Sequence, residues 1–282
     1  MIDFDVLWQP IVLVNDPAQL PPHVVAAGRL LLKPPGGEDL ETWWRRHLDA
    51  GVGDRVQGQL EFRLTPYLRE MQRVNQWHIP LHPEVAPSTR DWLPFWNDDE
   101  VALNLVYELP VDRLIDDWVW AEIELVRRSS RFGGRTPMVA GSHVGRQGLT
   151  ANLAEALNQS PFHVVLLDSG VTRDLSPVTG DPENDRRFDA LADFLQRLRP
   201  DLPVVATGVE QATEWQALRA LGLVYGQGSL WMKPTALDEV FTHRVPAFDP
   251  EWFPGAIYPN AEDWAVQHGL TLETRALAIE GR

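Results

Sequence analysis

Regular alternation of strand-like and helix-like segments after residue 100 constrains the fold of this chain more than any other feature. Short apolar, β-branched runs predict buried strands over residues 163–168 and 203–206. Apolar side chains at helical spacing predict helices over residues 186–198 and 212–221. Alternating strands and helices are typical of a parallel sheet with crossover connections. A (β/α) barrel and an open doubly wound sheet are therefore the two candidate architectures.

The remaining elements are expected along the rest of the chain. In the first part, strands are predicted over residues 6–14 and 24–32, and helices over residues 38–48 and 66–74, with a loop over residues 80–94. In the second part, strands are predicted over residues 101–105, 118–125 and 136–140, a helix over residues 151–157, and extended chain over residues 224–230. The length of 282 residues suits one large α/β domain of this kind.

Composition excludes several classes of protein. The chain has no cysteine, so it has neither disulfides nor thiolate metal sites. No apolar run reaches the ~18 residues of a membrane span, and residues 1–5 lack the basic start of a signal peptide. A net charge of -15 disfavours nucleic acid, whereas a small anion can still be bound by local donors. We therefore expect a cytoplasmic protein that binds no membrane and no nucleic acid polymer.

Polar residues follow several of the predicted strands. Asn104, Glu122, Asp168, Glu210 and Gln227 all fall at or near the end of such a segment. In a barrel with parallel strands, the carboxyl ends of the strands and the loops that follow them build the site. These residues are therefore candidates for a shared pocket.

Four segments, in order along the chain, resemble the EAL-type cyclic-di-GMP phosphodiesterase domain. They are Trp-Gln-Pro-Ile-Val at residues 8–12, Pro-Phe-His-Val-Val-Leu-Leu-Asp at residues 161–168, Val-Val-Ala-Thr-Gly-Val-Glu at residues 204–210, and Tyr-Gly-Gln-Gly-Ser-Leu at residues 225–230 with Lys-Pro after it. The resemblance implies an α/β fold, a (β/α)₈ TIM-like barrel whose first strand is antiparallel to the others. The barrel is expected over residues 1–234, with residues 235–282 as a C-terminal extension packed on it.

Active members of that family are commonly dimers that hold two Mg²⁺ or Mn²⁺ ions and hydrolyse cyclic-di-GMP with a metal-activated water. In this chain, the glutamate of the naming triplet aligns with Gly28, the Asp-Asp pair with Ala140 and Gly141, the lysine near the water with Leu166, and one further glutamate with Thr207. Hydrolysis with two metal ions needs clustered hard oxygen ligands. We therefore expect no catalytic residues, no metal site and no enzymatic activity.

The departures extend to the phosphate contacts. The family's phosphate-binding arginine aligns with Leu32, and the neighbouring Arg29 and Lys33 are expected to point elsewhere on the strand. His143 aligns with a glycine that follows the family's metal-binding pair. His78 and His82 are four residues apart, but Pro80 between them interrupts any helix that would bring them together.

The candidate ligand pocket comprises the polar residues that remain at family positions or strand ends: Gln9, Asn104, Glu122, Asp168, Glu210 and Gln227. Of these, Asn104 and Glu122 align with the family's asparagine and glutamate ligands. Gln9 and Gln227 either bond a guanine edge or serve as structural amides.

Asp168 and Glu210 also have structural alternatives. Asp168 either lines the pocket mouth or accepts the backbone N–H groups of the turn at Ser169 and Gly170. Glu210 either orients a ligand or caps the helix that begins near Ala212, and we favour the cap.

Three functions follow from these observations. The first is a catalytically inactive EAL-like domain that acts in signalling through a protein partner. The second is a receptor that binds cyclic-di-GMP without cleaving it. The third is a divergent phosphodiesterase, the only one of the three that requires Mg²⁺ or Mn²⁺. No cofactor is expected under the first two, and a homodimer is implied by the resemblance alone.

Overall fold

The computed structural model describes residues 2–14, 23–67, 77–80, 105–111, 138–160, 162–176 and 180–242. Several expectations fall on other residues: the strand over residues 118–125, most of the helix over residues 66–74, and all of the C-terminal extension beyond residue 242. No helix in the described ranges combines the length and the apolar character that crossing a membrane requires.

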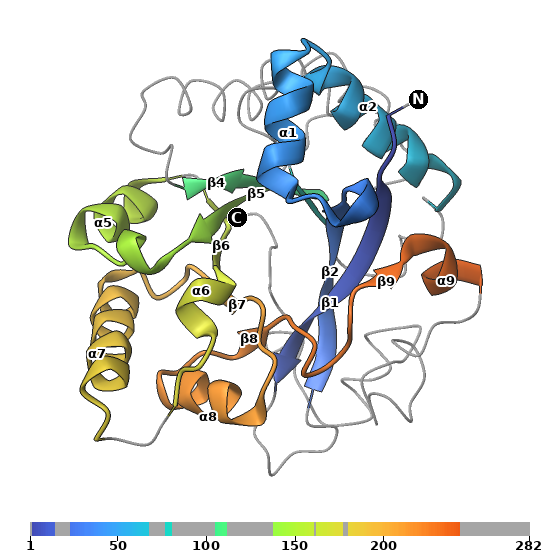
Figure 1. Ribbon diagram of the computed structural model, residues 1–282. Helices are drawn as coiled ribbons and strands as arrows, with labels where there is room; N and C mark the ends of the chain where they lie inside the picture. Colours follow the sequence, from blue (N-terminus) through green and yellow to red (C-terminus); the bar gives the residue numbers. More distant parts are fainter. Residues whose placement is uncertain are drawn as a thin grey trace.

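Eight strands close into a mixed barrel, which confirms the expected fold (Figure 1). The strands follow one another around the barrel in chain order, and β1 closes it by pairing with both β8 and β2. Strand β1 is antiparallel to both of these neighbours, whereas the pairs from β2 to β8 are parallel. The strands are β1 (Asp5–Val14), β2 (His23–Lys33), β3 (Trp77–Pro80), β4 (Leu105–Pro110), β5 (Met138–Val144), β6 (Val164–Leu167), β7 (Val204–Ala206) and β8 (Tyr225–Gly226).

The third and fourth strands lie where the sequence was hardest to interpret. Strand β3 (Trp77–Pro80) was not expected from the sequence. It ends at the residue where a loop was expected to begin. Strand β4 (Leu105–Pro110) starts at the last residue of the strand expected over residues 101–105, so that expectation ended too early.

The helices lie outside the strands, and α5, α7 and α8 cover the side of the barrel formed by β5 to β8 (Figure 1). Helix α2 was not expected from the sequence, whereas α1, α5, α7 and α8 lie within a few residues of their predicted positions. Their bounds are α1 (Leu40–Asp49), α2 (Gly53–Leu64), α5 (Ala151–Gln159), α6 (Ser169–Thr172), α7 (Pro182–Arg197), α8 (Ala212–Ala220) and α9 (Leu237–Thr242), with single 3₁₀ turns at η1 (Pro35–Gly37), η2 (Thr65–Tyr67) and η7 (Arg146–Gly148).

Side chains alternate between the inside and the outside of the barrel, as the period of a strand requires. A small interior cluster includes Ile11, Ala27, Val106, Leu166 and Val205. A larger outer cluster packs between the strands and the helices, with members such as Trp8, Leu30, Trp77, Val165 and Phe194. This alternation decides which residue of each strand can reach the centre of the barrel.

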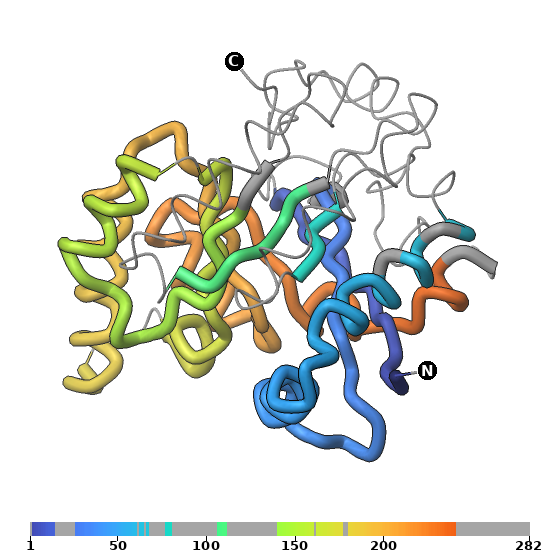
Figure 2. Tube along the Cα trace, turned by 90° about the horizontal axis from the view of Figure 1, so that it is seen from above, coloured from blue at the N-terminus to red at the C-terminus, as the bar shows by residue number. Residues whose placement is uncertain are grey.

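The first residues after the expected barrel boundary lie against the first strand. Strand β9 (Thr235–Ala236) pairs antiparallel with β1, through Leu7↔Ala236 and Trp8↔Thr235. Helix α9 follows directly and buries Leu237 and Val240. In both views, β9 and α9 run along one side of β1 (Figures 1 and 2).

Candidate active site at the barrel mouth

Arg29 lies at the centre of the barrel mouth. On β2, Ala27 belongs to the interior cluster and Arg29 follows two residues later, so the two face the same way. The Arg29 side chain is only 12% exposed, and its Nε and Nη2 atoms each donate to one carboxylate oxygen of Glu108 at 2.8 Å. The expectation that Arg29 points elsewhere is therefore wrong, because the strand register turns it inward.

Glu108 comes from β4 and completes a buried polar cluster with Arg29 and His78. The Glu108 side chain is 3% exposed, and its Oε1 atom lies 3.3 Å from Nδ1 of the fully buried His78. Desolvation by burial acts to raise the pKa of Glu108, but the charge of Arg29 and hydrogen bonds from His78 and Arg29 outweigh it and lower the pKa to about 2. Glu108 is therefore a carboxylate at neutral pH, and it is already held by a bidentate guanidinium.

Two amides extend this cluster across the barrel. Nη1 of Arg29 donates to Oε1 of Gln227 at 3.2 Å, and Nε2 of Gln227 donates to Oε1 of Gln9. Nε2 of Gln9 donates in turn to the backbone carbonyl of Met232 at 2.6 Å. The protein thus supplies partners to both amides, which supports their structural interpretation; as contacts to a nucleotide they remain predictions.

A cavity of about 210 Å³ opens beside this network. Its lining combines one cation, one carboxylate, several neutral polar groups and one apolar side chain: Arg29, His143, Leu166, Asp168, Ser169, Thr207, Gly208 and Gln227. This volume lies below the ~300 Å³ at which pockets for small organic ligands usually begin. The described part of the mouth therefore has room for a fragment of a ligand, such as one phosphate or one edge of a base.

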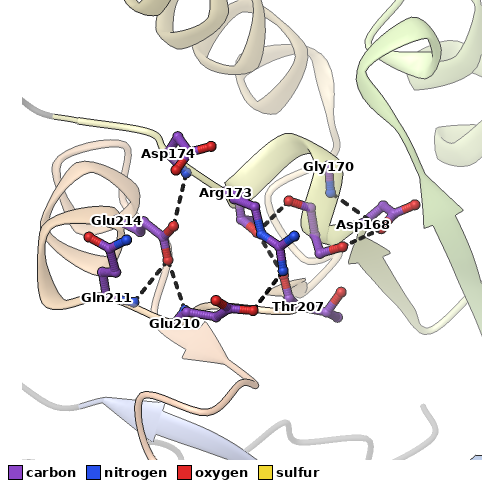
Figure 3. Close-up of polar contacts among 10 residues, drawn as sticks. Asp168, Gly170, Arg173, Asp174, Thr207, Glu210, Gln211 and Glu214 are labelled. Atoms are coloured by element: carbon purple, nitrogen blue, oxygen red, sulfur yellow. Dashed lines mark hydrogen bonds and ion pairs between the residues drawn. The ribbon is translucent and has the colours of Figure 1, made fainter.

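Asp168 lines that cavity and also holds the turn that follows β6 (Figure 3). Its Oδ1 atom accepts from the Ser169 hydroxyl at 3.0 Å and from the Gly170 backbone N–H at 3.4 Å. It is the N-terminal cap of the short helix α6. The sequence alternative of a turn-capping carboxylate is therefore confirmed, and a ligand contact by the same residue stays a prediction.

Glu210 does not cap the helix that follows it, so the preference for a cap was wrong. Its carboxylate pairs with Arg173 at 2.6 Å, and both side chains are about half exposed (Figure 3). The backbone N–H groups before α8 donate instead to Glu214, at 2.8 Å from Glu210 and 2.9 Å from Gln211. Glu214, on the first turn of α8, curls back toward these groups because they have no partner within the helix.

The register of β2 also moves the expected alignment with the EAL triplet by one residue, from Gly28 to Arg29. A Cβ atom on Gly28 would lie 2.2 Å from Nε1 of Trp8, so a side chain at residue 28 would point away from the barrel interior. The inward residue is Arg29, which therefore stands where a metal-binding glutamate of that triplet would have to be. The same shift moves the family's arginine from Leu32 to Lys33, an exposed residue.

At the other positions where the family's metal ligands are replaced, the side chain either has no ligand atom or uses it in a hydrogen bond within the protein. Ala140 and Leu166 are buried in the interior cluster, and Gly141 faces Val111 and Phe162 outside the barrel. The Thr207 hydroxyl donates to the Leu167 carbonyl at 2.7 Å. Within the described ranges, no group of three or more metal-ligating side chains converges. The described residues thus do not fit a two-metal centre, because a guanidinium is paired with Glu108, and Asp168 is the only described carboxylate in the lining of the cavity.

His143 has an unusual backbone conformation at the mouth. Its φ is 63°, in the left-handed region that favours glycine. The sequence comparison aligned it with a glycine, and the bulge between Gly141 and Val144 explains why this conformation is needed. His143 thus holds an imidazole on the rim of the cavity in a conformation that favours glycine. The sequence alone assigned no role to this residue.

Asn104 and Glu122, the two remaining candidates, lie outside the described residues. The structure instead brings Arg29, His78 and Glu108 together, none of which was among the candidates. The signal that could have found Glu108 is the alternation Val106-Tyr107-Glu108-Leu109, which puts valine and glutamate on one face of a strand.

Comparison with known proteins supports the same family. Residues 148–234 match the model of the EAL domain. No curated protein sequence matches the chain. The matched segment contains β6 to β8 and the residues Asp168, Thr207, Glu210 and Gln227.

Several solved structures share the fold over most of the chain. An EAL enzyme, Bd1971, in a cGMP-bound form is 18% identical with a TM-score of 0.62, over 84% of this chain and 64% of that one. The FimX EAL domain from Pseudomonas aeruginosa, bound to cyclic-di-GMP, is 15% identical with a TM-score of 0.60, over 82% and 90%. The phosphodiesterase PaMucR in complex with cyclic-di-GMP is 19% identical with a TM-score of 0.57, over 84% and 99%. This chain thus spans just under two thirds of the length of Bd1971.

Proposed function

Because the chain carries an EAL-type barrel, we propose that it is a non-hydrolytic EAL domain that acts in signalling through a protein partner. The observation that carries this proposal is the bidentate Arg29–Glu108 ion pair at the barrel mouth. Hydrolysis of a phosphodiester by two metal ions needs free carboxylates that hold the cations and activate water. Here the interior carboxylate is neutralised by an arginine, and its pKa of about 2 reflects that pairing.

A second function, binding of cyclic-di-GMP without cleavage, is favoured by the cavity beside Arg29. The cavity presents Arg29, Thr207, Gln227 and backbone of Gly208, and a guanidinium binds phosphate oxygens well. The FimX and PaMucR structures were obtained with this nucleotide. However, Arg29 is already committed to Glu108 and Gln227, so binding of a phosphate would require these groups to exchange partners.

One experiment separates these functions. Cyclic-di-GMP is titrated calorimetrically into the purified protein with Mg²⁺, with Mn²⁺ and with neither, and the nucleotide is then analysed by chromatography. The proposal expects no binding heat and intact nucleotide. Binding with intact nucleotide would establish the receptor instead, and Gln227→Ala should then weaken it. Metal-dependent appearance of linear product would overturn the non-hydrolytic assignment.

A further inference from the structure

Three arginines converge on a second cavity, on the outer side of the barrel. Arg146 from η7 and Arg186 and Arg187 from α7 line a hollow of about 240 Å³ together with Glu183. The apolar part of its lining consists of Leu149, Val171 and Ala190. The short helix α6 lies next to both cavities, since its Val171 lines this hollow and its Ser169 lines the cavity at the mouth.

Within the described part of the chain, none of the three guanidinium groups takes part in an ion pair. In an acidic chain, with 40 acidic and 25 basic residues, carboxylates are plentiful. Other arginines use them in ion pairs: Arg29, Arg45, Arg46, Arg173, Arg197 and Arg199. Among the described residues, no carboxylate forms an ion pair with Arg146, Arg186 or Arg187, although Glu183 is part of the same lining.

Backbone carbonyls accept hydrogen bonds from these arginines, but they do not use all of the guanidinium N–H donors. Nε of Arg146 donates to the Gly170 carbonyl, and Nε of Arg186 donates to the Pro182 carbonyl at 2.9 Å. Nη2 of Arg187 donates to the carbonyls of Val171, at 3.3 Å, and Arg173. The buried Nε atom of Arg187 has no partner within the described part of the chain. That atom has almost no solvent-accessible surface, so the donors that a ligand in the hollow can reach are Nη atoms, above all those of the exposed Arg146 and Arg186.

The positive charges also act on one another. Desolvation by burial and the charge of Arg146 both lower the pKa of Arg187, against the opposing effects of Asp174, Glu183 and Asp181. Placing guanidinium groups together costs free energy that a bound anion recovers. Planar guanidinium groups match the oxygens of phosphate, and the apolar lining suits an organic substituent next to it.

We propose that the hollow between η7 and α7 binds a phosphate group through Arg146, Arg186 and Arg187. The group is either free inorganic phosphate or the phosphate of a small ester whose organic part lies on Leu149, Val171 and Ala190. No described residue lines both this hollow and the barrel mouth, so the proposal does not depend on whether the mouth binds cyclic-di-GMP.

The test is calorimetric titration of the full chain with inorganic phosphate and, separately, with phenyl phosphate, in chloride buffers of matched ionic strength. One site per chain is expected, with phenyl phosphate binding more tightly if the ester is the natural ligand. Arg146→Gln and Arg187→Gln should each weaken binding at least tenfold. Arg197→Gln, on the same helix but paired with Asp193, is the matched control and should bind as the parent does.

Arg187 also holds two backbone carbonyls, so thermal unfolding of each variant accompanies the titration. Exposed Arg146 provides the variant least able to disturb the fold, and Arg146→Lys should restore part of the affinity because it keeps the charge. Absence of binding heat with both probes would overturn the proposal. So would unchanged affinity in a folded Arg146→Gln, or an equal loss in Arg197→Gln.

Discussion

Arg29 supplies the positive charge beside the buried carboxylate of Glu108 at the barrel mouth. A buried charge that loses its partner is strongly destabilising, so Arg29 and Glu108 depend on each other. His78 is fully buried beside Glu108 and is the third polar group of this cluster. Burying a polar group without polar neighbours costs free energy, so His78 also depends on the cluster.

Glu108→Gln should lower the free energy of unfolding by about 3–5 kcal/mol, because it leaves the Arg29 charge buried without a counter-ion. The measurement is urea-induced unfolding followed by circular dichroism. Asp193→Asn removes the exposed partner of Arg197 and serves as the control, with an expected loss below about 1 kcal/mol. Equal losses of unfolding free energy in the two variants would show that the buried Arg29–Glu108 pair stabilises the fold no more than the exposed Arg197–Asp193 pair does.

The same pair predicts how stability depends on pH. The pKa of Glu108 falls from 4.5 in its ordinary state to about 2 in the folded protein, so its contribution is complete above pH 4.5 and is lost as the pH falls toward 2. Unfolding titrations between pH 6 and pH 2 should therefore show a steeper loss in the parent than in Glu108→Gln. Parallel curves for the two proteins would contradict the lowered pKa.

At the scale of single elements, strand register decides which residues share the mouth. Strand β2 turns Arg29 inward and Gly28 toward Trp8, and the bulge in β5 places His143 at a φ of 63°. Neither arrangement can be predicted from the pattern of a single strand, because small and apolar residues can lie on either face of it. Pairing with the neighbouring strands selects one of them.

This register can be tested with two glutamate substitutions. Arg29→Glu should create a carboxylate beside Glu108, and Mn²⁺ at millimolar concentration should then raise the melting temperature by several degrees. Gly28→Glu should destabilise the fold, because its Cβ atom meets the Trp8 indole, and should show no Mn²⁺ effect. The parent is the second control. Stabilisation of Gly28→Glu alone by Mn²⁺ would favour the original alignment.

The beginning of α8 provides another prediction at this scale. Glu214 is 1% exposed and accepts from the backbone N–H groups of Asp174, Glu210 and Gln211. Glu214→Ala leaves these donors unpaired and should cost about 2–4 kcal/mol in urea unfolding. Glu210→Ala removes only a surface ion pair and should cost less than about 1 kcal/mol. The reverse order would restore Glu210 as the cap.

At the scale of the whole molecule, the first residues after the expected boundary at residue 234 pack on the barrel. Strand β9 adds to the edge of β1, and α9 buries Leu237 and Val240 against the outer core. These residues therefore cover β1, the strand that closes the barrel.

Two truncations measure this contribution. A chain ending at Pro234 should be less stable than one ending at Thr242 by about 3–5 kcal/mol, because two buried apolar side chains and the β9–β1 pairing are lost. Leu237→Ala in the full chain checks the same packing and should cost about 2–4 kcal/mol. Equal unfolding midpoints for the two truncations would place the boundary at residue 234, as the sequence predicts.

Much of the barrel could be predicted from residues near one another in the chain. Strands β1, β2, β6 and β7 and helices α1, α5, α7 and α8 have apolar periodicity that depends only on local geometry, so their positions were predicted within a few residues. The four motifs in order then indicated a resemblance to the EAL domain, whose model matches residues 148–234. Strand β3 was missed because it lies among scattered prolines and aromatic residues that obscure the pattern, and strand β4 was expected too early along the chain.

The chemistry of the mouth could not be predicted in this way. Arg29 meets Glu108 across 79 residues and Gln227 across 198, and both contacts require the barrel to be closed in one register. A shift of one residue on β2 would turn Arg29 outward and leave Glu108 without its counter-ion. Local sequence preferences are nearly the same in both registers, whereas burial of Trp8 against Gly28 and pairing of the two charges favour only one.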